Sequence, residues 1–249
     1  MFDAGHHHRI GSKQLDGFPV AGLHSYYNFI PNPAYDQRLY DSSGHNRYGR
    51  LGDSVVADAT DPAWVGNSLY FEPQAWVYLL SPGGVPTPLY QTNFSLIFAL
   101  KAAAQSDVTF YCDTNAGSDD PHFRLATGTA DTAKLRVSIR TAPGTVQLSV
   151  ESTATVFDGD WHLVGYTDEG GTYAIYVDGE TADTGSYSHA SPTFNRSVLG
   201  ILMGVGISGQ FTGTLGQLVR WSRALSAAEY SLARAALKTR LLSQGIALP

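Results

Sequence analysis

Cysteine and charged residues are both scarce in this 249-residue sequence. Cys112 is the only cysteine, which excludes an intrachain disulfide and a zinc site built from several cysteines. Charged residues make up 15% of the chain, with 16 Lys and Arg against 22 Asp and Glu, and the basic residues are scattered, apart from a modest set near the C-terminus. Nucleic-acid binding needs a basic stripe that releases counterions, so we expect no nucleic-acid partner.

Long hydrophobic runs are missing as well. No apolar stretch approaches the roughly 18 residues that a membrane span requires, so we expect no membrane insertion. The N-terminal residues MFDAGHHHRIGSKQLDGF lack the apolar stretch and cleavage site of a secretory signal peptide, and we expect synthesis in a cytoplasm. Hydrophobic residues still make up 43% of the chain, which is enough to build a folded core.

Short segments rich in β-forming residues recur along the chain, with turn residues between them. Residues 135–140 alternate strictly between apolar and polar side chains, which indicates a strand with one buried face. Residues 172–179 end in Asp-Gly, which predicts a hairpin turn. Turn formers dominate residues 31–61, where we expect one long loop. This pattern is typical of a β-sandwich or barrel, with strands predicted near 20–29, 68–71, 94–100, 108–112, 123–127, 135–140, 146–150, 161–167, 173–177, 199–203 and 215–221.

One helix is predicted near the C-terminus. Ser226 and Glu229 have the spacing of a capping box, and an Ala- and Leu-rich segment follows. An apolar stripe at helical spacing, which we expect to pack on the sandwich or on another subunit, consists of Tyr230, Ala233, Leu237 and Leu241. The predicted organisation is therefore a flexible arm (1–17), a β-sandwich (18–225), and a C-terminal helix and tail (226–249).

Three segments in order carry a resemblance to a known family. The first is GLHSYYNF (22–29) with the turn DSSGHN (41–46), the second is FDGDWHLV (157–164) leading to IYVDG (175–179), and the third runs from FTG (211–213) to LVRWSRALSAAE (218–229). They resemble the laminin G-like branch of the concanavalin A-like lectin and glucanase superfamily. The resemblance implies an all-β fold, a two-sheet antiparallel jelly-roll sandwich with a C-terminal helix, and structural roles for Trp161 and His162.

Catalytic patterns are absent from the sequence. Glucanases with this fold carry Glu-x-Asp-x-x-Glu on one strand, and no such pattern occurs here; Asp158 and Asp160 are interpreted as turn residues. There is no Gly-x-Ser-x-Gly elbow, and Cys112 has only His122 within reach across a hairpin, which favours a buried thiol. We therefore predict no catalytic residues, no cofactor-binding residues and no enzymatic activity.

Calcium is the one ligand ion that the resemblance suggests, because related modules often bind it through loop carboxylates. Asp119 and Asp120 form one acidic pair, and a second set of calcium candidates comprises Asp36, Asp41, Asp58 and Asp61. His6 and His8 have a spacing that could hold a transition metal on the axis of a trimer, although a disordered arm or tag remnant explains them more simply.

The preferred interpretation is a non-enzymatic virion structural protein: a phage capsid decoration protein or a tail-associated receptor-binding subunit. Its partners would be other virion proteins, copies of itself or a host-surface glycan, and its location would be the virion. The alternative is a calcium-dependent carbohydrate-binding module, and a glucanase-like hydrolase ranks third.

Overall fold

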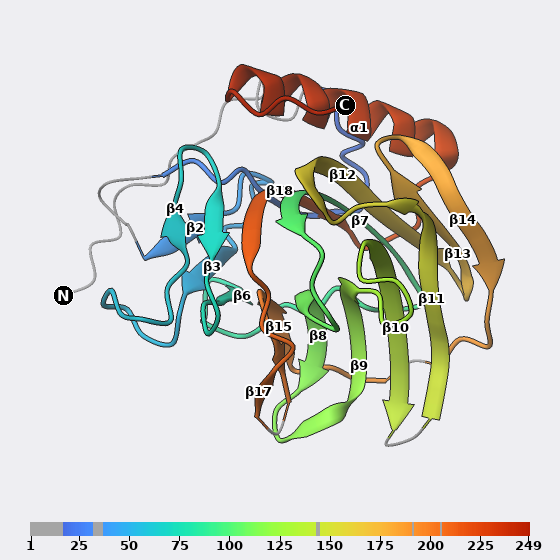
Figure 1. Ribbon diagram of the computed structural model, residues 1–249, viewed down its shortest axis with the longest axis horizontal. Coiled ribbons are helices and arrows are strands. Elements are labelled where there is room, and N and C mark those ends of the chain that lie inside the picture. Colours follow the sequence, from blue (N-terminus) through green and yellow to red (C-terminus); the bar gives the residue numbers. More distant parts are fainter. Residues whose placement is uncertain (1–16, 32–36, 143–144, 191, 205) are drawn as a thin grey trace.

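The structure, a computed structural model, describes residues 17–31, 37–142, 145–190, 192–204 and 206–249. Two antiparallel sheets stack face to face, and a helix lies along the outside of one of them (Figure 1). The predicted jelly-roll sandwich with a C-terminal helix is therefore confirmed. The predicted arm, apart from Gly17, lies outside the described residues, as do Asp36, His6 and His8.

The sheet that contacts the helix, here called sheet A, has eight strands. Seven follow one another by hydrogen bonding, and the eighth, β1 (Leu23–Tyr27), pairs with β18. In spatial order the seven are β14 (Glu180–Ser186), β13 (Thr172–Val177), β12 (Asp158–Glu169), β7 (Asn93–Ala103), β18 (Gly213–Trp221), β5 (Leu69–Phe71) and β4 (Ala63–Trp64).

The opposite sheet, here called sheet B, also has eight strands. In spatial order they are β11 (Thr145–Thr155), β10 (Lys134–Ala142), β9 (Ser118–Thr127), β8 (Thr109–Asn115), β15 (Arg196–Leu199), β6 (Val77–Leu80), β3 (Tyr48–Leu51) and β2 (Arg38–Tyr40). A small two-stranded sheet pairs β16 (Leu202–Met203) with β17 (Ile207–Ser208).

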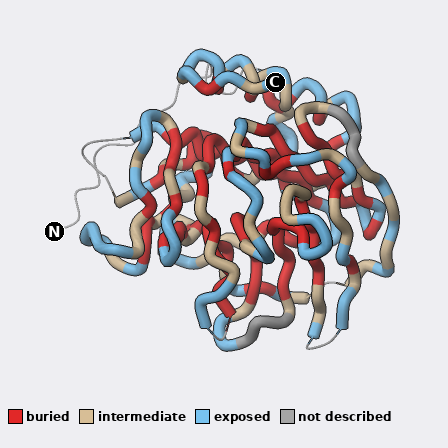
Figure 2. Tube along the Cα trace, viewed as in Figure 1, coloured by how far each residue is buried: buried red, intermediate tan, exposed pale blue. Residues whose placement is uncertain are grey.

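Alternate side chains of the facing strands fill the space between the sheets, as Figure 2 shows by the burial along the strands. Aromatic rings form much of this core. The rings of Phe98 and Phe110 meet edge to face at 5.4 Å, and Phe94 meets Phe123 in the same way at 5.0 Å. The predicted alternation of residues 135–140 is confirmed, because Leu135, Val137 and Ile139 all face this core.

The helix α1 (Ala227–Ser243) begins at the predicted capping box. Ser226 accepts a hydrogen bond from the Glu229 backbone, and Glu229 accepts one from the Ser226 backbone. The predicted stripe of Tyr230, Ala233, Leu237 and Leu241 is buried against sheet A, which settles the open question of its partner in favour of the sandwich. Among the described residues, no helix has the length and apolar character to cross a bilayer.

Tyr230 is the centre of this helix–sheet contact. Its ring stacks on Tyr176 of β13 at 3.7 Å, and it lies over Gly165 of β12, where a Cβ atom would come within 2.4 Å of the ring. Arg234 adds a polar contact, because its Nη2 donates to the carbonyl oxygen of Asp178 at 2.5 Å. A glycine at position 165 is therefore what allows the helix to pack this closely.

The prediction of one long loop over residues 31–61 was wrong. Two short strands, β2 and β3, interrupt it and pair with each other. Leu39 and Leu51 each reach the core between the sheets, and their burial outweighs the turn preference of the surrounding Asp, Asn, Ser and Gly residues. The strands β6 and β14 were also not predicted.

A polar group of the core involves Arg220 of β18, whose side chain is 0% exposed. Its Nε donates to Ser25 Oγ at 2.7 Å, its Nη1 donates to the Thr87 carbonyl oxygen at 3.1 Å, and its guanidinium lies 5.5 Å from the centre of the Tyr27 ring. Asp113, also fully buried, accepts hydrogen bonds from the backbone amides of residues 89 and 90, and burial raises its pKa. This network ties the β6–β7 connection to both sheets.

The outermost strands of both sheets are short or irregular. The edge strands β4 and β2 have two and three residues. The β10–β11 ladder keeps a regular register only from Arg136–Glu151 to Ile139–Leu148, with shifts on either side. Beyond that regular stretch, the backbone N–H of Thr153 donates to the Asp183 carboxylate of β14 at 2.8 Å.

Candidate functional site

The outer face of sheet B is the best candidate for a binding surface, because α1 covers the corresponding face of sheet A. Inward and outward residues of sheet B are assigned by alternation, since the inward ones belong to the core. Arginine is the most frequent charged residue among the outward side chains, at Arg38, Arg50, Arg124, Arg136, Arg140 and Arg196. These positions are far apart in the sequence, so the arginine-rich face is created by folding.

The small sheet of β16 and β17 covers the middle of this face. Leu202 and Met203 pack there with Cys112 and Val198, which are outward residues of neighbouring strands. The hydroxyl of Tyr78 contacts the Met203 sulfur at 2.6 Å. The cover divides the outer face of sheet B into two parts.

The part over β2, β3 and β6 carries a group of side chains that we call the tyrosine–arginine strip: Arg38, Tyr40, Tyr48, Arg50 and Tyr78. The Arg38 guanidinium lies 4.8 Å from the centre of the Tyr48 ring, and the Arg50 guanidinium lies 4.9 Å from the centre of the Tyr78 ring. Arg38 is exposed and the other four side chains are half-buried. The strip therefore presents planar groups and N–H donors to solvent.

Charge is poorly balanced within the strip. Arg38 and Arg50 are direct partners across the β2–β3 ladder, so two positive side chains of the same face stand opposite each other. Asp53 is 4.0 Å from Arg50, and its side chain is 73% exposed. Burial raises the pKa of Tyr78, so its phenol stays neutral and adds no negative charge.

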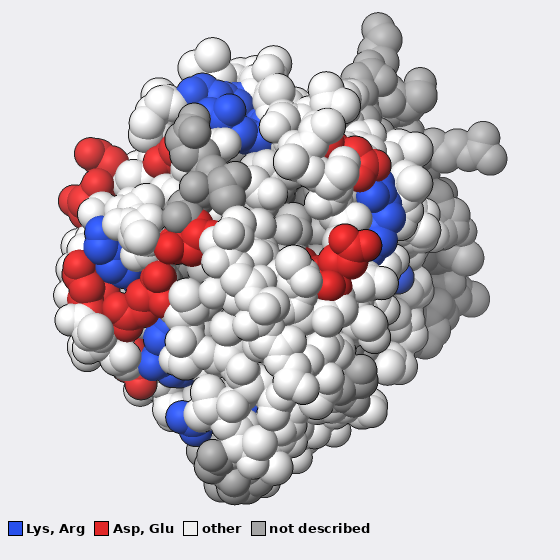
Figure 3. Space-filling model, turned by 90° about the vertical axis from the view of Figure 1, so that its right-hand side faces the viewer, with Lys and Arg blue, Asp and Glu red and all other residues white. Residues whose placement is uncertain are grey.

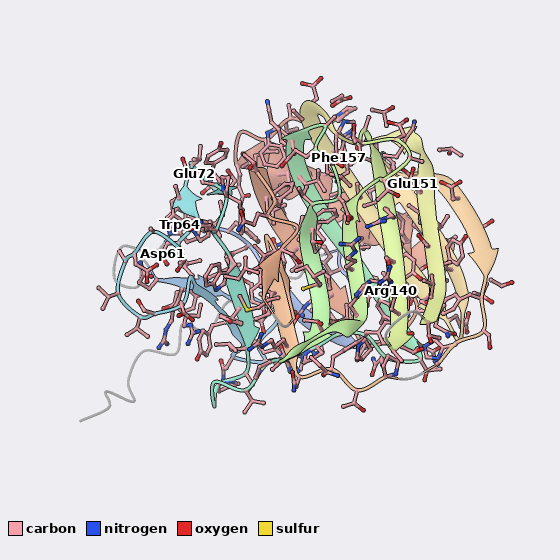
Figure 4. The ribbon with its side chains drawn as sticks, turned by 60° about the horizontal axis from the view of Figure 1, so that its bottom comes forward. Asp61, Trp64, Glu72, Arg140, Glu151 and Phe157 are labelled. Atoms are coloured by element: carbon pink, nitrogen blue, oxygen red, sulfur yellow. The ribbon has the colours of Figure 1, made fainter. Side chains whose placement is uncertain are left out.

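The part over β9 and β10 is organised differently. Arg124 and Arg136 both donate to the Oδ1 atom of Asp107, with Arg124 at 2.6 Å. The side chains of both arginines are 9% exposed, so they hold the β7–β8 connection in place more than they face solvent. Figure 4 shows Arg140 and Glu151 on the β10–β11 part, away from Asp61, Trp64 and Glu72 at the other side of the molecule.

One other face of the molecule carries charged groups of both signs (Figure 3). On the side of the molecule drawn in Figure 3, acidic and basic side chains lie next to one another. In the strip, by contrast, two arginines are register partners on neighbouring strands.

The three predicted calcium ligands that the structure describes do not come together as one set. Asp41 is buried, and its Oδ1 accepts hydrogen bonds from the backbone amides of Tyr26 at 2.8 Å and Ser43 at 2.9 Å, so this carboxylate closes the turn that follows β2. Asp58 and Asp61 lie together in the β3–β4 loop, where Asp61 accepts a hydrogen bond from the Asp58 backbone at 3.0 Å.

Within the described ranges, no three His, Cys, Asp or Glu side chains gather closely enough to hold a metal ion. Asp58 accepts three hydrogen bonds from Thr60 and Ser54, and bonds to Thr60 lower its pKa. The predicted ligands Asp36, His6 and His8 and the side chains of Asp119 and Asp120 are outside the described residues. Calcium binding stays a prediction.

The residues weighed for catalysis have structural contacts. His162 lies between two carboxylates, with Nδ1 2.7 Å from Asp178 and Nε2 3.0 Å from Asp158, and the hydrogen bond to Asp178 raises its pKa to about 9. Trp161 is half-buried at the border of the cluster beneath α1. These contacts join β12 to the turn after β13.

Cys112 does not meet His122. Its register partner across the hairpin is Arg124, its sulfur contacts the carbonyl oxygen of Ile201 at 3.2 Å, and burial raises its pKa to about 12. His122 instead lies 3.2 Å from Ser138 Oγ. A thiol held in this way has almost no thiolate at neutral pH.

The tyrosine–arginine strip was not predicted from the sequence. Four of its five residues fall in the segment interpreted as a loop. The alternation Arg38-Leu39-Tyr40 and Tyr48-Gly49-Arg50-Leu51 is the signal that could have indicated two short strands with polar outer faces.

Comparisons with known proteins agree with this fold. One similar solved structure is Domain 4 of AbnA, a GH43 extracellular arabinanase from Geobacillus stearothermophilus, in complex with arabinotriose. Its TM-score is 0.59 at 16% sequence identity, and the match covers 85% of this chain and 98% of that one. A structure of botulinum neurotoxin type C, whose cell entry depends on interaction with two ganglioside molecules, has a TM-score of 0.62 at 12% identity. The binding domain of botulinum neurotoxin DC in complex with SialylT gives the same TM-score and identity.

This chain spans about half the length of those neurotoxin chains, matching 52% of each through 88% of its own residues. At these identities the likeness concerns the fold alone. A comparison with curated proteins gave no match.

Family membership comes from the sequence. Residues 74–230, well over half of the chain, match the family described as Concanavalin A-like lectin/glucanases superfamily. The matched region runs from just before β6 into the first turn of α1 and includes the segments that carried the resemblance at Trp161 and Trp221. The chain therefore belongs to the laminin G-like branch of the concanavalin A-like lectin and glucanase superfamily.

Proposed function

We propose that this protein is a non-enzymatic glycan-binding domain and that the tyrosine–arginine strip contacts the ligand. The main support is the composition of the strip, which places three tyrosine rings and two guanidinium groups on one face of β2, β3 and β6, partly open to solvent. Saccharides are bound by aromatic rings together with a few well-placed hydrogen-bond donors. The family and the glycan complexes named among the similar structures support the proposal.

A glycan array tests the proposal with the purified full-length chain. We expect binding to a defined set of glycans, and Tyr48→Ala should weaken it by roughly tenfold or more, equivalent to about 1.4 kcal/mol. Tyr70→Ala is the matched control, because Tyr70 is a half-buried tyrosine of β5 in the other sheet. Equal losses in both variants, or no binding to any glycan, would contradict the proposal.

Two further properties belong to the same proposal. Release of reducing ends from the bound glycan is not expected, since the sequence lacks the Glu-x-Asp-x-x-Glu pattern that glucanases with this fold carry on one strand. If calcium contributes, a chelator should reduce glycan affinity and added calcium should restore it; unchanged affinity would leave a calcium-independent domain.

A structural role in a phage particle, as a decoration protein or tail-associated subunit, is a second proposal. It is supported by the outer side of α1, where Leu232 and Leu242 are 61% and 65% exposed, although nearly three turns apart and about 80° from each other around the helix axis. The occupant we propose is a second copy of this chain. Light scattering should give an oligomer that Leu232→Lys dissociates, and a monomer at all concentrations would refute it.

A further inference from the structure

The opposed arginines of the strip are the feature of this molecule that local packing explains least. Arg38 and Arg50 face each other across β2 and β3, and like charges in that position destabilise a sheet. Arginine remains protonated in proteins, so neither side chain can relieve the repulsion by losing its proton. The chain as a whole carries a formal net charge of -6, which makes a repulsive positive pair more unusual here.

Neighbouring groups offset the repulsion only in part. Among the described residues, Arg50 forms an ion pair with Asp53 at 4.0 Å, and the Asp53 side chain is largely exposed to solvent. Exposed ion pairs of this kind contribute about 0–1 kcal/mol to stability. The Nε atom of Arg50 is buried without a hydrogen-bond partner. An anion bound by both guanidinium groups would offset the repulsion between them.

The tyrosines of the strip point to the same type of ligand. Guanidinium groups lie over the rings of Tyr48 and Tyr78 at 4.8 and 4.9 Å, so those ring faces are already in contact with cations. A sugar approaching them meets arginine N–H groups before it can stack on the rings. Planar guanidinium groups match carboxylates with two parallel hydrogen bonds.

We propose that the Arg38–Arg50 pair selects saccharides that carry a carboxylate group, such as uronic or sialic acids. This inference rests on the proposed glycan-binding function and specifies its ligand class. The rings of Tyr48 and Tyr78 hold the two guanidinium groups in place, and the carboxylate accepts hydrogen bonds from both.

The test compares acidic glycans with their neutral counterparts by titration calorimetry on the full-length chain. The probes are polygalacturonate with its fully methyl-esterified form, and a sialylated oligosaccharide with the same oligosaccharide lacking sialic acid. We expect each acidic probe that binds to do so at least about tenfold more tightly than its counterpart. The variant Arg38→Gln/Arg50→Gln should lose this preference.

Lys101→Gln serves as the matched control, because Lys101 is an exposed cation of β7 in the other sheet. It should retain the preference. Without ligand, the melting temperature of the double variant should lie within about 2 °C of the wild type. The stabilising cation–ring contacts and the destabilising charge repulsion that it loses contribute similar free energies. Loss of affinity could then not be attributed to unfolding.

Three results would overturn the inference. Equal affinity for acidic and neutral probes, unchanged in the double variant, means a neutral ligand and leaves the glycan-binding proposal intact. Binding of a thymidine oligonucleotide as tight as that of the best acidic glycan, with the same salt dependence, means a general polyanion surface. Absence of binding to both acidic and neutral glycans refutes the inference along with the function on which it rests.

Discussion

Gly165→Ala tests how closely α1 packs on sheet A. A Cβ atom at this position would lie 2.4 Å from the Tyr230 ring, whereas carbon atoms in contact are about 3.5–4.0 Å apart. The ring would have to move by more than about 1 Å, and Tyr176 stacks on it at 3.7 Å and leaves little room. We expect a loss of about 1–3 kcal/mol in the free energy of unfolding, measured by urea denaturation.

A double-mutant cycle makes the prediction specific to this contact. Tyr230→Ala alone should cost about 3–5 kcal/mol, and the double variant should cost less than the sum of the two, because the new methyl group enters space vacated by the ring. Gly83→Ala is the control, since a Cβ there would meet nothing within 4 Å. If Gly165→Ala is as stable as Gly83→Ala, the helix does not pack as described.

Three further changes probe polar groups. Tyr230→Phe should stabilise the protein by about 1 kcal/mol, because the buried Tyr230 hydroxyl has no hydrogen-bond partner; a loss of stability in thermal melts would reveal a missed partner. The hydrogen bond to Asp178 raises the pKa of His162 to about 9, so its stabilisation is complete below about pH 6.5 and is lost as pH rises through about 9. The melting-temperature gap between wild type and His162→Gln should therefore shrink from pH 6 to pH 10, and a constant gap would contradict the assignment. Arg220→Met should cost about 3–5 kcal/mol in urea denaturation, since it leaves Asp113 buried without the positive charge that reaches it through the Tyr111 hydroxyl, and a change under about 1 kcal/mol would show that the network is dispensable.

The fold was predictable where local signals and burial agree. The alternation of Leu135, Val137 and Ile139 and the capping box at Ser226 are strong local patterns, and both are present in the structure. β2 and β3 were missed because each is too short for a period of two to stand out among turn-forming neighbours. Their pairing depends on burial of single leucines by distant strands, which local sequence does not record.

The candidate site was harder to predict than the fold. Its residues come from three strands separated in the chain, and the scattered arginines of the sequence meet on one face only through sheet pairing. The carboxylates considered as calcium ligands share a segment of sequence, yet Asp41 closes one turn while Asp58 and Asp61 occupy another loop. Nearness in sequence was therefore a poor guide to nearness in space.

The irregular outer strands affect how the protein behaves at high concentration. An exposed strand edge can recruit another chain into its sheet and begin aggregation. Only four consecutive residues of β11 pair with β10 in a regular register, and beyond them the Asp183 carboxylate accepts a hydrogen bond from the backbone N–H of Thr153. Many copies could therefore be crowded together, on a particle or along a polymeric glycan, with little tendency to form amyloid-like contacts.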